Sequence, residues 1–156
     1  MAHPTNIRSI AASLGFLAFL VAACSTVSMT PPAPTPADIT GIATELTTRG
    51  LTLGHLVSGD AGCEDPDLIP TAIGFDASGL DQAEPVRLRL YIFRNREAFE
   101  RLRATVAMCA RSYVTDPEGF ETVEQSPYVL AAQGPWPPEF KAAVADALEA
   151  AAGNGA

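Results

Sequence analysis

The chain has 156 residues, a formal net charge of −8 at pH 7 and 47% hydrophobic residues. An acidic protein repels the phosphate backbone of nucleic acids, so nucleic acid is excluded as a partner. The same charge gives the protein as a whole no electrostatic attraction to anionic lipid headgroups. The length suits a single small domain.

An apolar segment near the N-terminus predicts export. Arg8 is the only charged side chain before it, and residues 10–23 are apolar or small apart from Ser13. A helix of that length extends about 21 Å, which is short of the ~30 Å hydrocarbon core of a bilayer. A short positive segment followed by such a run is typical of a signal peptide and not of a permanent membrane span.

The apolar segment ends in two small residues and a cysteine, in the sequence Leu17-Ala18-Phe19-Leu20-Val21-Ala22-Ala23-Cys24. It resembles the lipobox of bacterial lipoprotein precursors, although Val21 stands where leucine is commonest. The resemblance covers residues 1–24 and implies removal of residues 1–23 and acylation of Cys24, with palmitate among the acyl chains. Two or three such chains hold a protein firmly at a membrane. The alternatives are a secreted protein with a chance cysteine and a short uncleaved anchor.

The resemblance also implies an address on the extracytoplasmic side of a bacterial membrane. Ser25 replaces the Asp that favours inner-membrane retention in Gram-negative lipoproteins, so the outer membrane or cell surface is expected. Removal of residues 1–23 would take away Arg8 and no acid, and would change the net charge from −8 to −9.

Residues 24–37 are rich in proline and predict a stiff extended tether, about 30 Å long at ~3.1 Å per residue. Its prolines are Pro31, Pro32, Pro34 and Pro36. Residues 38–152 are expected to form one domain, and residues 153–156 a flexible C-terminus.

With Cys24 acylated, two cysteines remain in an exported chain, Cys63 and Cys109. An even remainder in an oxidising compartment predicts one structural disulfide. The loop that it closes would contribute on the order of 4 kcal/mol in the chain-entropy model. Two free buried thiols are the alternative, and the absence of a C-x-x-C pair argues against a redox-active site.

The expected elements follow in chain order. Residues 38–49 form a helix capped by Asp38, and residues 51–57 and 69–77 form two strands. The third strand covers residues 86–93, and a helix capped by Asn95 follows over residues 95–113. Residues 120–123 are extended, residues 128–132 form a fourth strand, and a last helix runs from the prolines at 137 and 138 to Gly153.

The third strand has the clearest pattern in the chain. Four apolar side chains, Val86, Leu88, Leu90 and Ile92, alternate with Arg87, Arg89, Tyr91 and Phe93. Such alternation is typical of an antiparallel sheet with one covered face and one wetter face. The expected fold is therefore α+β, a mainly antiparallel sheet of about four strands with helices packed on one face and one disulfide.

The wetter face of this strand is the candidate ligand site. Arg87, Arg89, Tyr91 and Phe93 combine cations with aromatic rings, which suits a small anionic ligand. If the last helix covers that face, the aromatic side chains are core and the arginines lie at its border. Seven arginines fall between residues 87 and 111, but Glu97 and Glu100 interleave with them, which favours a salt-bridged surface over an anion-binding patch.

No pattern predicts catalytic residues, a metal or a cofactor. His55 is the only histidine after residue 23, and no G-x-S-x-G surrounds Ser58, Ser112 or Ser126, the serines it would have to activate. Four acids crowd one loop, Asp60, Glu64, Asp65 and Asp67, but their spacing misses the calcium-binding pattern and predicts a solvated turn. Trp136 is either an exposed partner anchor or part of the core.

These features predict a lipid-anchored cell-envelope protein whose domain is a non-enzymatic binding or interaction module. Its partner would be an envelope protein or a small anionic ligand, besides the membrane that holds the anchor. A small enzyme using an acidic residue such as Asp60 or Glu64 is the first alternative, and a purely structural envelope component is the second.

Overall fold

The computed structural model describes residues 37–153. The expected signal peptide, the lipidation site Cys24 and the tether as far as Pro36 lie outside the described residues, as do residues 154–156. No helix in the described part of the chain is long and apolar enough to cross a bilayer.

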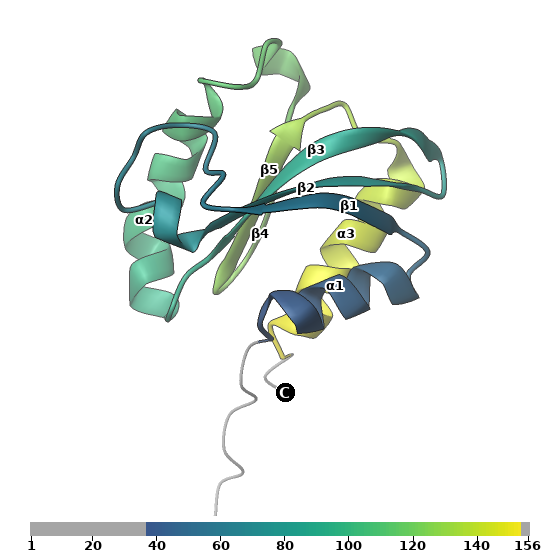
Figure 1. The fold of residues 1–156 in the computed structure, drawn as a ribbon, viewed down its shortest axis with the longest axis horizontal. Coiled ribbons are helices and arrows are strands. Elements are labelled where there is room, and N and C mark those ends of the chain that lie inside the picture. The colour runs from purple at the N-terminus through teal and green to yellow at the C-terminus, as the bar shows by residue number, and fades with distance from the viewer. Residues whose placement is uncertain (1–36, 154–156) are drawn as a thin grey trace, which may run out of the picture. The chain divides into compact units, whose positions relative to one another are not determined.

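Three α-helices surround one antiparallel sheet of five strands (Figure 1). The helices are α1 (Ile39–Thr48), α2 (Arg96–Ala110) and α3 (Pro138–Ala151). The strands are β1 (Thr52–Ser58), β2 (Ala72–Gly79), β3 (Gln82–Ile92), β4 (Phe120–Gln125) and β5 (Tyr128–Gln133). Two short 3-10 helices, η1 (Ile69–Thr71) and η2 (Pro117–Gly119), precede β2 and β4.

The α+β class and the antiparallel sheet are confirmed. The sheet has five strands where about four were expected, because residues 120–125 pair fully with β5. The strand order is β1-β2-β3-β5-β4, so the β4–β5 hairpin joins the sheet through β5 beside the long central strand β3. Leu90 lies opposite Leu130, and Tyr91 lies opposite Val129.

The helices cover both faces of the sheet, and the expectation of one covered face was wrong in this detail. Leu88, Leu90 and Leu130 pack with α1 and α3 in one apolar cluster. Tyr91, Phe93 and other side chains on the opposite face pack with α2 and the loop before β2 in a second cluster. Figure 1 shows α2 on one side of the sheet and α1 and α3 on the other. Every residue of β5 from Tyr128 to Ala132 is buried, and a strand that is apolar on both faces needs cover on both.

The first two helices begin as their sequences predict. The Asp38 carboxylate accepts from the Gly41 amide at 2.9 Å, and the Asn95 side chain accepts from the Ala98 amide at 2.8 Å. Each satisfies one of the amides that has no partner within the helix.

The third helix is capped from a distant part of the chain. Its N-cap residue, Pro137, provides no side-chain hydrogen bond. Asp81, in the turn between β2 and β3, accepts from the amides of Glu139 and Phe140 at 2.9 and 2.8 Å. This carboxylate ties α3 to the β2–β3 hairpin.

The predicted disulfide is confirmed. Cys63 and Cys109 are bonded, with their Cα atoms 5.5 Å apart, and they are separated by 46 positions in the sequence. The bond fastens the loop after β1 to the buried side of α2.

Candidate functional site

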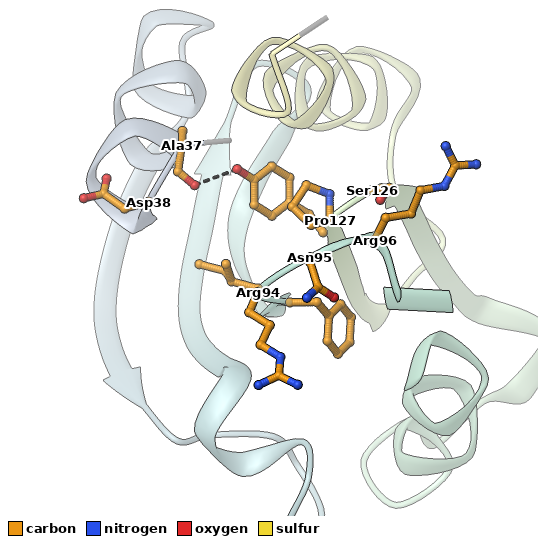
Figure 2. A pocket seen from close by; sticks show the side chains of 10 residues that line it. Ala37, Asp38, Arg94, Asn95, Arg96, Ser126 and Pro127 are labelled. Atoms are coloured by element: carbon orange, nitrogen blue, oxygen red, sulfur yellow. Dashed lines mark hydrogen bonds between the residues drawn. The ribbon is translucent and has the colours of Figure 1, made fainter. Parts of the chain in front are cut away.

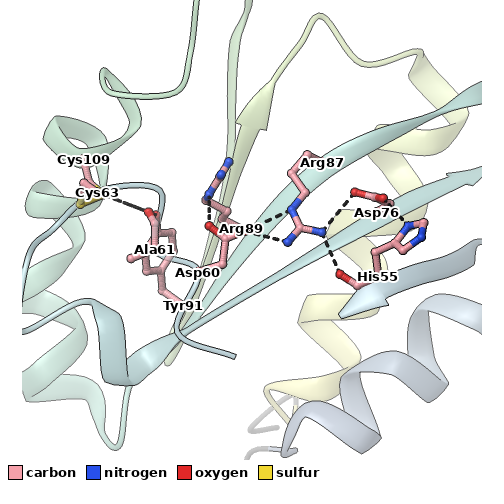
Figure 3. Close-up of polar contacts among 9 residues, drawn as sticks. All are labelled: His55, Asp60, Ala61, Cys63, Asp76, Arg87, Arg89, Tyr91 and Cys109. Carbon is pink, nitrogen blue, oxygen red and sulfur yellow. Dashed lines mark hydrogen bonds and ion pairs between the residues drawn. A yellow bond between two sulfur atoms is a disulfide. The ribbon is translucent and has the colours of Figure 1, made fainter. Parts of the chain in front are cut away.

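A network of ion pairs lies on the same face of the sheet as α2, next to the second apolar cluster (Figure 3). Asp60, in the loop after β1, receives Arg87 Nη2 at 2.7 Å and Arg89 Nε at 3.0 Å, one on each carboxylate oxygen. Gly74 on β2 makes room for it, because a Cβ there would overlap both the Asp60 carboxylate and the Arg87 guanidinium. One acid thus pairs with both arginines of β3.

The network continues to β1. Arg87 Nη1 donates to Asp76 Oδ1 at 3.2 Å and to the His55 carbonyl at 2.8 Å. His55 Nδ1 lies 2.8 Å from Asp76 Oδ2. His55 has a φ of 49° beside a β-bulge in β1, and its side chain is 85% exposed. The bulge turns the ring out of the strand and toward solvent.

Both acids of the network are held in the ionised form. Burial raises the pKa of Asp60, but the hydrogen bonds and charges of Arg87 and Arg89 outweigh it and bring the pKa below its usual value. The hydrogen bond from His55, followed by Arg87, lowers the pKa of Asp76. Carboxylates in this state are fixed counter-ions and poor proton donors at neutral pH.

The loop is also fixed by Tyr91 and the disulfide. Tyr91 Oη donates to the Ala61 carbonyl at 2.7 Å, and burial raises the pKa of Tyr91. Cys109 Sγ lies 3.0 Å from the same carbonyl, a close contact without a hydrogen bond because a disulfide sulfur carries no proton. The Arg89 guanidinium lies over the Tyr113 ring, 4.0 Å from its centre.

The predicted ligand face is therefore occupied by the protein itself. Tyr91 and Phe93 are buried beneath α2 and the loop, while Arg87 and Arg89 bind Asp60. This outcome matches the alternative in which the aromatic side chains are core. The helix that covers them is α2, however, and not the last helix, α3.

The other candidates of the sequence also have internal roles. In residues 37–153, His55 makes no hydrogen bond to a serine. Asp65 accepts from the amides of Asp67 and Leu68, and the part of the chain that the structure describes has no group of three metal-ligating side chains. Trp136 is buried and donates to the Gln133 carbonyl, so it closes the core.

A pocket of about 430 Å³ lies at the end of the sheet where α1 and α2 begin (Figure 2). Its walls come from residues 37–38 before α1, residues 92–96 between β3 and α2, and residues 126–128 at the β4–β5 turn. Ile92 and Tyr128, which pair across β3 and β5, both line it. Ile92, Phe93 and Pro127 add to its apolar surface.

Two arginines flank the pocket. Arg94 and Arg96 are exposed on either side of Asn95, and Figure 2 shows their guanidinium groups pointing away from each other. Neither has an acidic partner among the described residues. The one acid lining the pocket, Asp38, is engaged in capping α1.

The pocket also contains the point where the described domain begins. Tyr128 Oη donates to the Ala37 carbonyl at 2.6 Å, and the Ala37 amide donates to the Ala151 carbonyl at 2.8 Å. Burial raises the pKa of Tyr128, as does the charge of Asp38, so the phenol keeps its proton. Ala37 is thereby tied to β5 and α3.

A second cavity of about 300 Å³ lies between the end of α2 and η2. Apolar side chains surround it, with Arg111 the charged residue in its lining. Its lining has fewer polar side chains than that of the first pocket.

Comparison with protein-family models, with curated proteins and with solved structures finds no match to this chain.

The sequence reasoning included Arg94 and Arg96 in the arginine-rich segment but missed the pocket. No local pattern joins them to residues 126–128, since these segments meet only because β5 pairs with β3. The Asn95 cap was the available signal, because it places both arginines at the start of a helix.

Proposed function

We propose that the chain is the precursor of a bacterial lipoprotein, anchored through an acylated Cys24 on the extracytoplasmic side of the outer membrane or cell surface. Its domain is a non-enzymatic binding or interaction module of the cell envelope. The proposal combines the lipobox resemblance of residues 1–24 with the architecture of residues 37–153.

The pocket beside Ala37 is the observation that carries the binding function. It is concave and largely apolar, and two arginines without acidic partners in the described chain flank it. Sites for small molecules share this combination of an apolar lining with a few convergent polar groups. Ala37, the last residue of the expected tether, is part of the pocket lining.

The disulfide supports the export part of the proposal. Structural disulfides persist in oxidising compartments and are rare in the cytosol. The Cys63–Cys109 bond lies within the domain, and a lipoprotein carried across the membrane would form it there.

The acidic network gives no support to the alternative enzyme. Asp60 is bound by two guanidinium groups and its pKa is lowered, whereas a general acid needs a raised pKa. Glu64 is exposed in its loop.

Intact-mass analysis of the membrane fraction tests the anchor. We expect the mature chain to begin at a Cys24 that carries acyl chains, and Cys24→Ala to carry none. Ser25→Ala is the matched control and should be acylated normally. An unmodified Cys24, or an N-terminus elsewhere, would contradict the lipoprotein proposal.

Native mass spectrometry tests the binding function. The Cys24→Ala chain, exported from a bacterial host behind a conventional cleavable leader, should retain a small anionic molecule or an envelope partner that is absent after denaturation. A bare monomer in every preparation would favour the structural alternative.

A further inference from the structure

We propose that the pocket lined by Arg94, Arg96 and Tyr128 binds the phosphate group of an anionic ligand that also carries an apolar part. The inference deepens the proposed function and rests on it for the compartment in which the protein encounters the ligand. Binding at the pocket can be measured without the lipid anchor.

The lining of the pocket carries a positive net charge, whereas the protein as a whole is negatively charged. Its lining holds two arginines and one acid, in a chain whose net charge is −8. The other cations of the described residues are mostly paired with acids, as in Arg49 with Glu45 and Lys141 with Glu121. Arg101 and Arg111 also lack an acidic partner there, but neither lines this pocket.

Both arginines are free to turn toward a ligand. Their side chains are exposed and have no acidic partner within residues 37–153. Reorienting these side chains costs conformational entropy. The charge-assisted hydrogen bonds that a guanidinium donates to phosphate oxygens offset this cost. Two guanidinium groups approaching from opposite sides suit a phosphate better than a carboxylate, because phosphate presents more acceptor oxygens.

The start of α2 adds to this preference. Asn95 satisfies the Ala98 amide, and by helix geometry the amides of Arg96 and Glu97 have no partner within the helix. The positive end of a 15-residue helix also favours an anion.

The apolar lining determines which chemical group the ligand carries besides its phosphate. Ile92, Phe93, Pro127 and the Tyr128 ring line the pocket together with the two arginines. A phosphate ester with an apolar body satisfies both parts of the pocket. Two sources share this chemistry: the headgroup region of an anionic membrane lipid, which the tether would bring near, and a small soluble phosphate ester.

The first arm of the test uses inorganic phosphate and phenyl phosphate as soluble probes. Each is titrated into the Cys24→Ala chain while the amide NMR signals of residues near the pocket are followed. We expect saturable shifts at Ala37, Arg96 and Glu97, with phenyl phosphate binding more tightly. Arg94→Gln/Arg96→Gln should weaken binding at least tenfold, because it removes the charge-assisted hydrogen bonds that the two arginines donate to the phosphate.

Arg101→Gln/Arg111→Gln is the control, since it removes the same charge from the end and outer side of α2. It should bind phenyl phosphate within about twofold of the parent chain, since that difference corresponds to only ~0.4 kcal/mol. Equal losses in the two double variants would show that the effect is general electrostatics and would overturn the site. The absence of saturable shifts in the parent chain would do the same.

The second arm distinguishes the sources. The Cys24→Ala chain is sedimented with vesicles of phosphatidylglycerol and phosphatidylcholine, and with vesicles of phosphatidylcholine alone. Sedimentation that needs phosphatidylglycerol and is lost in Arg94→Gln/Arg96→Gln identifies the lipid source. Phenyl phosphate binding without such sedimentation supports the pocket and identifies the soluble source. Failure of the proposed function would instead appear as an unacylated Cys24, which leaves both arms unaffected.

Discussion

The hydroxyl of Tyr128 donates to the carbonyl of Ala37 at 2.6 Å, across 91 positions of sequence. Ala37 in turn donates to Ala151, so the first described residue is held against a central strand and against the end of the last helix. The same phenol lines the pocket that Arg94 and Arg96 flank. One side chain therefore both lines the candidate site and fixes the position of Ala37.

Tyr128→Phe should lower the free energy of unfolding by about 1–3 kcal/mol, because it leaves the Ala37 carbonyl without its donor. Urea denaturation of the Cys24→Ala chain measures this. Tyr113→Phe is the matched control: its hydroxyl is buried without a hydrogen-bond partner among the described residues, so its loss should be neutral or slightly stabilising. Similar losses of unfolding free energy in the two variants would contradict a stabilising role for the Tyr128–Ala37 hydrogen bond.

Asp60→Asn should destabilise the domain, since Arg89 would lose its acidic partner and Arg87 would keep only Asp76. We expect a loss of about 1–3 kcal/mol, below the value for a fully buried pair because the Arg87 side chain is 30% exposed. Asp67→Asn changes an exposed acid of the same loop and should alter stability by less than ~0.5 kcal/mol.

The same variant should also change the pH dependence of stability. The pKa of Asp60 is lower in the folded than in the unfolded chain, so its contribution is complete above the unfolded-state value of about 3.9. That contribution is lost as the pH falls through the lower folded-state pKa. Denaturation midpoints measured across this acidic window should fall less steeply in Asp60→Asn than in the parent. Parallel curves would contradict the pairing.

Asp81→Ala should cost about 0.5–2 kcal/mol, because the amides of Glu139 and Phe140 lose their acceptor. Asp81→Asn removes the charge and keeps one of the two acceptor oxygens, so its stability should lie between those of the parent chain and Asp81→Ala. Thermal unfolding compares the three chains. A loss as large in Asp81→Asn as in Asp81→Ala would assign the effect to charge and not to capping.

The sequence by itself determined the elements whose signals are local. The alternation from Val86 to Phe93 predicted which side chains of β3 share a face. Asp38 and Asn95 identified the starts of two helices. The even number of cysteines after Cys24 predicted the bond between Cys63 and Cys109. These signals depend on side-chain periodicity, on hydrogen bonds that reach only three residues, or on counting.

Only the tertiary structure decided which side chains remain open to a ligand. The pattern of β3 did not reveal that α2 covers Tyr91 and Phe93, or that Asp60 binds both arginines from 27 and 29 positions away. Nor did any local signal join Asp81 to Phe140, or residues 126–128 to Arg94 and Arg96. Contacts over such separations depend on the path of the whole chain, here on the insertion of β5 beside β3, and periodicity within one element carries no record of that path.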